Sequence, residues 1–121
     1  MELARKYGKK ARDLRLNYYS LYTTSNYHKL KAILDKRGIT YVCVQYPIRN
    51  LEPLKKIFQG NDKGIIFVDN ERIFRDAVAK DSHQNYFRDM FGGEFGHCTE
   101  KGNRLLAENI ANVILKEVFG K

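Results

Sequence analysis

Long apolar runs and cysteine are both scarce in this 121-residue sequence. It has no run of 18 apolar residues, so no membrane-spanning helix is expected. The first sixteen residues, MELARKYGKKARDLRL, are charged throughout and lack the apolar core of a signal peptide. We therefore expect no secretion signal and take the cytoplasm as the default compartment. The two cysteines, Cys43 and Cys98, lie in such different contexts that free thiols are expected rather than a disulfide framework.

The charge is distributed unevenly along the chain. Residues 1–57 contain 13 Lys or Arg and 4 Asp or Glu, whereas residues 58–121 contain 9 and 10. A basic half is typical of proteins that bind nucleic acid or an acidic partner. The solvated faces of two ordinary helices would produce the same bias, and we favour that interpretation because no known nucleic-acid-binding motif accompanies the charge.

The length itself predicts one domain with one modest core.

The N-terminal part of the chain predicts two helices. Apolar residues recur at helical spacing through residues 2–20, with charges between them. A polar break follows, and Thr24 or Ser25 is expected to cap a second helix over residues 26–36. Gly38 is well placed to end that helix.

A strand, a short helix and a second strand are predicted next. Residues 40–47 are β-branched, aromatic and almost continuously apolar, which is typical of a strand buried on both faces. Cys43 lies within it, where a packing role is favoured over any chemistry. Residues 51–58 predict a short helix with Pro53 in its first turn, and residues 64–70 predict a second buried strand. This order predicts parallel pairing through a right-handed crossover.

Three more helices are expected in the C-terminal half, over residues 71–80, 82–91 and 100–119. Their apolar residues recur at the spacing of buried helix faces. They are Ile73, Phe74, Ala77 and Val78 in the first helix, Tyr86, Phe87, Met90 and Phe91 in the second, and Leu106, Ile110, Val113, Ile114 and Val118 in the last.

These elements predict an α/β protein with a partial flavodoxin-like, three-layer fold of at least two parallel strands and flanking helices. A sheet of two strands has two open edges and little support. Strands this apolar therefore require neighbours, from a second copy of the chain or from a larger sheet of which this chain is a piece. We expect the sheet to be completed by self-association, with a homodimer as the simplest assembly.

The segment between the last two predicted helices has the composition of a reactive loop. Its glycines let the backbone turn sharply and leave the imidazole of His97 accessible. Glu94, three residues earlier, can reach the Nδ1–H of His97, which would fix the tautomer and leave Nε2 as a general base. Thr99 is a good N-cap for the last helix, whose N-terminus disfavours a charged imidazolium. The same spacing also occurs in ordinary polar loops.

Residues 94–111, EFGHCTEKGNRLLAENIA, resemble the last conserved block of the SGNH hydrolases, also called GDSL esterases and lipases. That block has an Asp, two further residues and the catalytic His, followed by a helix that begins with Leu or Ile and Ala. Two upstream segments also agree: RGITYVCVQYP resembles the strand beneath the site, and GIIFVDNERIF resembles the last strand before the His loop. The resemblance covers residues 23–119.

The resemblance implies roles for two residues of this chain. His97 matches the family's general base, and Glu94 stands where the family has the Asp that orients it. Glu is one methylene longer, so the same hydrogen bond requires a different rotamer or a shifted loop. In some bacterial members the domain follows tetratricopeptide repeats. Residues 1–22 are accordingly interpreted as a basic helix that ends such an array, and residues 23–121 as the C-terminal part of the hydrolase domain.

The family's nucleophile, a serine on a Gly-Asp-Ser turn after a strand, has no counterpart among the three serines of this chain. Ser20 and Ser25 flank helices in a polar linker, and Ser82 follows a predicted helix rather than a strand. Residues 60–62, Gly-Asn-Asp, imitate the family's Gly-x-Asn-Asp block, but a turn is needed there anyway. The resemblance therefore implies part of a serine ester hydrolase that acts on esters of lipids, acylated sugars or small alcohols and is inactive alone.

Other chemistries are less well supported by the sequence. Cys98 adjoins His97, and neighbouring side chains of an extended loop diverge, so a packing role is expected for it. A metal site from Glu94, His97, Cys98 and His83 matches no standard zinc spacing, and we expect neither metal nor cofactor. The alternative function is a non-catalytic α/β binding module whose basic half contacts an acidic partner or nucleic acid. Salt-dependent binding to a generic duplex would favour that alternative.

Overall fold

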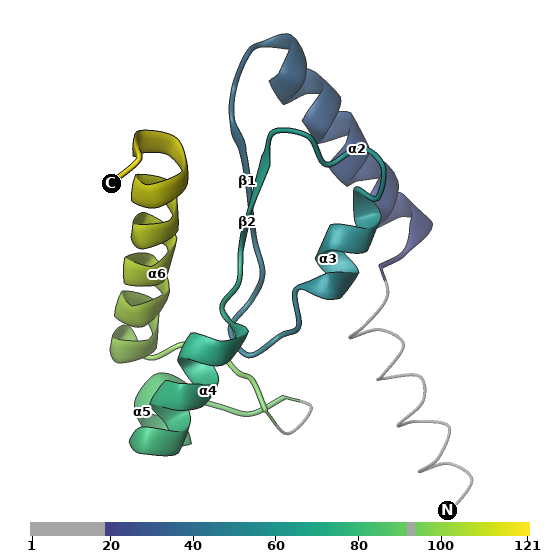
Figure 1. Cartoon of the computed structure of the whole chain (residues 1–121). Coiled ribbons are helices and arrows are strands. Elements are labelled where there is room, and N and C mark those ends of the chain that lie inside the picture. The colour runs from purple at the N-terminus through teal and green to yellow at the C-terminus, as the bar shows by residue number, and fades with distance from the viewer. Residues whose placement is uncertain (1–18, 92–93) are drawn as a thin grey trace, which may run out of the picture.

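The computed structural model describes residues 19–91 and 94–121, and Figure 1 shows how their elements are arranged. The elements in chain order are α2 (Leu21–Lys36), β1 (Tyr41–Val44), α3 (Glu52–Ile57), β2 (Ile65–Val68), α4 (Glu71–Lys80), α5 (His83–Tyr86) and α6 (Glu100–Phe119). The predicted helix over residues 2–20 falls almost entirely outside the described residues.

The two strands pair in parallel, with Tyr41 opposite Ile65 and Val44 opposite Val68. The helices α2 and α3 lie on one side of the strands and α6 on the other, while α4 and α5 lie beyond the carboxyl ends (Figure 1). The predicted mixed α/β class and parallel sheet are thus confirmed. Among the described residues the sheet has these two strands only, so both of its outer edges are without a partner strand.

The first hydrophobic cluster fills the space between the strands and the pair α2 and α3. Phe58, which is fully buried, lies at its centre, with the rings of Tyr27, Tyr41 and Phe67 between 5.7 and 6.1 Å from its own. Cys43 is buried in the same cluster as a free thiol, which confirms its predicted packing role. This cluster explains why the strands are apolar on the face toward α2 and α3.

The second cluster lies beyond the carboxyl ends of the strands. Its buried members are Ile48, Phe74, Tyr86 and Phe87, with residues of α4 and α6 packed around them. The prediction that Met90 and Phe91 anchor a helix over residues 82–91 is wrong, because both side chains are about half exposed. The helix α5 ends at Tyr86, since the backbone of Phe87 is extended, with φ −131° and ψ 135°.

The start of α2 also differs from the prediction. Ser20, rather than Thr24 or Ser25, is the N-cap, and its hydroxyl accepts a hydrogen bond of 3.2 Å from the backbone N–H of Thr23. The helix therefore begins five residues earlier than expected. The predicted domain boundary between residues 22 and 23 falls inside it.

The long helix α6 has its predicted bounds, from the N-cap Thr99 to Gly120, which is left-handed with φ 67°. Of its predicted apolar stripe, Leu106, Ile110, Val113 and Ile114 are partly buried, whereas Val118 is 45% exposed. Leu115 and Phe119 are also exposed, at 44 and 63%. The physical reason is that α6 packs on α5 and β2, while the described sheet has no third strand to cover the rest of the helix. No helix in the described ranges is long and apolar enough to cross a membrane.

Candidate functional site

The His97 loop connects α5 to α6 and has the form of a narrow hairpin. Isolated antiparallel bridges join Phe87 to Cys98 and Phe91 to Phe95. The backbone N–H of Arg88 also donates to the carbonyl of His97, at 2.8 Å. The outgoing and returning segments are thereby held side by side, and residues eight positions apart in sequence come into contact.

The hairpin brings Asp89 against His97. One carboxylate oxygen of Asp89 lies 2.6 Å from Nδ1 of His97, and the other accepts a 2.6 Å hydrogen bond from the His97 backbone N–H. The His97 side chain is 71% exposed and that of Asp89 41%. With the proton on Nδ1, the ring presents Nε2 as a free acceptor. A base and the carboxylate that orients it would need this geometry.

The electrostatics of the pair suit a general base. The hydrogen bond from the His97 side chain, followed by that from its backbone N–H, holds the pKa of Asp89 below its usual value. Asp89 is therefore fully ionised at neutral pH and stabilises an imidazolium when one forms. The ring of Phe91 lies edge-on to the imidazole, with centroids 5.3 Å apart.

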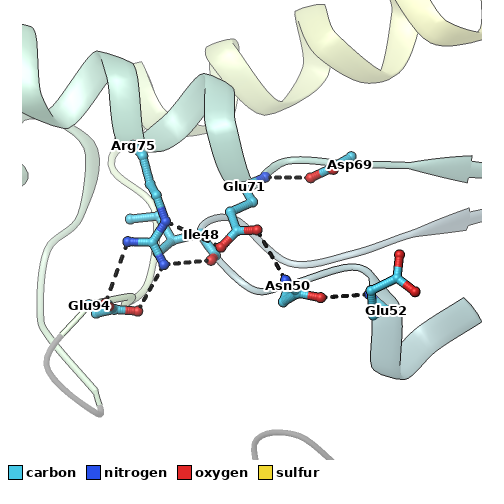
Figure 2. A network of polar contacts seen from close by, with 7 residues as sticks. All are labelled: Ile48, Asn50, Glu52, Asp69, Glu71, Arg75 and Glu94. Atoms are coloured by element: carbon cyan, nitrogen blue, oxygen red, sulfur yellow. Dashed lines mark hydrogen bonds and ion pairs between the residues drawn. The ribbon is translucent and has the colours of Figure 1, made fainter. Parts of the chain in front are cut away.

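Glu94 does not contact the His97 ring, so the predicted Glu94–His97 pairing is wrong in this structure. Its carboxylate lies 3.1 and 3.5 Å from the guanidinium of Arg75, which also binds Glu71 at 3.3 Å and the carbonyl of Ile48 (Figure 2). The physical reason is that an arginine with several donors competes better for this carboxylate than a single ring N–H already paired with Asp89. The hydrogen bonds from Arg75 tie the loop to α4.

Gly96 is required by the close approach of the two segments of the loop. A Cβ at this position would lie 2.0 Å from the backbone oxygen of Asp89 and 2.5 Å from its carboxylate. No side chain fits there without moving the Asp89 backbone. The absence of a side chain at Gly96 is therefore what lets Asp89 sit beside His97.

Buried polar groups hold together the chain segments that leave the two strands. The side chain of Asn70, which is fully buried, donates to the carbonyl of Gln45 at 2.8 Å and accepts from Asn109 of α6 at 2.7 Å. The backbone N–H of Ile48 donates to the carbonyl of Asn70, at 3.1 Å. These contacts connect the ends of β1 and β2 to each other and to α6, and each of them satisfies a group of Asn70 that would otherwise be buried without a partner.

The other sequence candidates have structural roles. Ser20 and Ser82 cap α2 and α5, and Ser25 is exposed within α2. Burial raises the pKa of the Cys98 thiol, which leaves it protonated and poorly nucleophilic at neutral pH. The 2.7 Å bond from Asn61 N–H to the carbonyl of Phe58 closes a turn over residues 58–61, which overlaps the predicted turn at residues 60–62.

The metal hypothesis finds no support in the described ranges, where no three His, Cys, Asp or Glu side chains gather in the manner of a metal site. His83, one of the residues considered for it, instead directs Nε2 to the carbonyl of Glu94, at 3.2 Å.

Comparisons with known proteins were made at three levels. No family model, curated protein or solved structure matches this chain. The candidate site therefore stands on its own geometry.

Two of its residues were missed by sequence reasoning. Asp89 falls within the predicted helix over residues 82–91, and its distance of eight positions from His97 carries no helical or triad signal. Tyr46 falls within the predicted strand over residues 40–47, but in the structure it follows β1 at the carboxyl end, where functional side chains of α/β sheets gather. The Tyr46 hydroxyl donates a 2.6 Å hydrogen bond to the carbonyl of Gly96.

Proposed function

We propose that this chain supplies the general-base part of a serine ester hydrolase of the SGNH type. The single observation that carries the proposal is the pair of 2.6 Å contacts between Asp89 and His97, together with the exposure of the His97 ring. Asp89 takes the orienting role for which Glu94 was expected. The resemblance in sequence around His97 supports the same chemistry.

In the proposed reaction, Nε2 of His97 accepts the proton of a serine hydroxyl as its oxygen attacks an ester carbonyl. Asp89 stabilises the imidazolium that forms. His97 then donates this proton to the leaving alcohol, and an acyl-serine remains. Water repeats the sequence with the same histidine and releases the acid.

The nucleophile in this proposal comes from a polypeptide segment outside residues 1–121, whose three serines are Ser20, Ser25 and Ser82. Ser20 and Ser82 are engaged as helix caps, and neither follows a strand. The chain by itself is therefore proposed to be inactive toward esters.

The uncharged outer edge of β1 is the proposed place where the sheet is completed. No charged residue occurs from Ile39 to Ile48, and both Ile39 and Val44 are at least 40% exposed. Proteins protect free strand edges with charges, so an uncharged edge favours pairing. A parallel strand added here would end beside Tyr46, which contacts the His97 loop. Such additions would produce the three-layer, flavodoxin-like sheet.

Without another partner, a second copy of the chain is proposed to occupy the β1 edge. Light scattering of the purified 14.2 kDa chain is expected to give the mass of a dimer, because pairing of two β1 edges would satisfy the free N–H and C=O groups of both. A mass that stays monomeric down to high dilution and up to high concentration would contradict this self-association.

The proposed function is tested by complementation. The full chain is co-expressed with the N-terminal portion of an active SGNH esterase that carries its Gly-Asp-Ser block and stops before its own His loop. Hydrolysis of a short-chain nitrophenyl ester is expected only when both polypeptides are present, and His97→Ala should abolish it. Turnover by the chain alone, lost on His97→Ala, would contradict the absence of a nucleophile. A folded complex without activity would contradict the hydrolase proposal.

The binding-module alternative stays a prediction. Residues 1–18, with six Lys or Arg and two Asp or Glu, hold +4 of the net charge of +8. They lie outside the described part of the chain, whereas residues 19–57 hold seven Lys or Arg and two Asp or Glu, the remaining +5 of the basic half.

A further inference from the structure

Tyr46 connects the end of β1 to the His97 loop. Its hydroxyl donates to the carbonyl of Gly96 at 2.6 Å, and its ring packs edge-on against Phe95, with centroids 5.8 Å apart. Tyr46 is 39% exposed, and its backbone N–H donates a 2.8 Å hydrogen bond to the side-chain oxygen of Gln45. Tyr46 is thus held by the buried polar groups at the strand ends while its hydroxyl reaches into the loop.

The Gly96 carbonyl that accepts the hydrogen bond from Tyr46 belongs to the peptide group that joins Gly96 to His97. The carbonyl of this group accepts from Tyr46, and its N–H donates to Asp89 at 2.6 Å. Because a trans peptide group is planar, its C=O and N–H point in opposite directions. The two hydrogen bonds therefore pin the group from opposite sides and set the direction in which the His97 side chain leaves the backbone.

The same two bonds also reinforce each other. Donation to a peptide carbonyl polarises the peptide group and makes its N–H a better donor, so the Tyr46 bond strengthens the bond from His97 to Asp89. Burial, and then the nearby Cys98 and Asp89, raise the pKa of Tyr46, so its hydroxyl keeps its proton throughout the neutral range.

We propose that Tyr46 is a positioning residue for His97, acting through the peptide group between Gly96 and His97. The importance of this role for catalysis rests on the proposed function. The geometric role is a property of the chain alone. Loss of the Tyr46 hydroxyl is expected to weaken the hydrogen bond from the His97 backbone N–H to Asp89. The contact between the imidazole and Asp89 is expected to weaken with it.

The test is hydrogen–deuterium exchange by NMR on the full chain carrying Tyr46→Phe, which removes only the hydroxyl. Exchange of the His97 backbone N–H is expected to accelerate by roughly two- to tenfold, the effect of losing about one net hydrogen bond. The amides of Arg88 and Thr99, which bond across the same loop to His97 and Tyr86, serve as internal references and are expected to change less. Tyr22→Phe, at a tyrosine that is 85% exposed, is the matched control.

Each of the following results would overturn the proposal. An unchanged His97 exchange rate would show that the hydroxyl does not hold this peptide group. Equal acceleration at Arg88, His97 and Thr99, or loss of the folded state, would assign Tyr46 a general structural role. Phe95→Leu keeps the hydroxyl and removes the ring contact, so acceleration there equal to that of Tyr46→Phe would also contradict a role for the hydrogen bond. The measurement needs neither ester nor partner, so its failure is distinct from a failed complementation.

Discussion

Replacement of Asp89 by asparagine is expected to lower ester turnover of the complemented enzyme by roughly 10³- to 10⁴-fold, the size of effect known for a triad carboxylate changed to an amide. Both carboxylate oxygens of Asp89 accept hydrogen bonds from His97, one from the backbone N–H and one from the ring. An asparagine has only one acceptor oxygen. If its NH₂ group faces the ring, it favours the tautomer with the proton on Nε2, which cannot act as a base.

The matched control is Glu94→Gln. Glu94 lies against Arg75 in an exposed ion pair, so its loss removes at most about 1 kcal/mol of stability and leaves the His97 ring untouched. Turnover should then stay within a few-fold of the unmodified enzyme. A larger loss for Glu94→Gln than for Asp89→Asn, measured as kcat on the same nitrophenyl ester, would return the orienting role to Glu94.

Phe58→Ala is expected to lower the free energy of unfolding by about 3–5 kcal/mol. Phe58 is fully buried, and it packs against rings from α2, β1 and β2, among them His28 at 5.4 Å and Tyr41 at 5.7 Å. Truncation removes apolar contact area and leaves a cavity lined by aromatic rings that cannot collapse independently. Because domains of this size have a total stability of about 5–15 kcal/mol, the loss is a large part of the whole.

The measurement is urea denaturation followed by circular dichroism, at one fixed protein concentration because self-association contributes to apparent stability. Phe119→Ala at the exposed end of α6 is the matched control and should change the free energy of unfolding by no more than about 0.5 kcal/mol. Equal effects of the two substitutions would show that the cluster around Phe58 does not hold α2 and α3 on the strands.

Local sequence signals predicted most of the elements. The helix α4 and the helix α6 have their predicted bounds, because an amphipathic period and clear end signals occur together there. The strands were placed correctly but are shorter than predicted, since the polar contacts of Gln45 and Asn70 take over where the ladder ends. The prediction of a helix over residues 82–91 is wrong beyond Tyr86, because aromatic spacing alone does not distinguish a short helix from a loop whose rings pack on neighbouring elements.

The sequence by itself determined that His97 stands in a glycine-containing loop directly before a capped helix, because capping and turn preferences act over a few residues. Only the tertiary structure decided which carboxylate reaches the ring. The antiparallel return of the loop brings Asp89 to His97 from eight positions away, and the guanidinium of Arg75 draws Glu94 elsewhere. Tyr46 reaches the same loop from 50 positions away. Contacts of this range depend on how the strands and helices pack, for which no local pattern in the chain carries a signal.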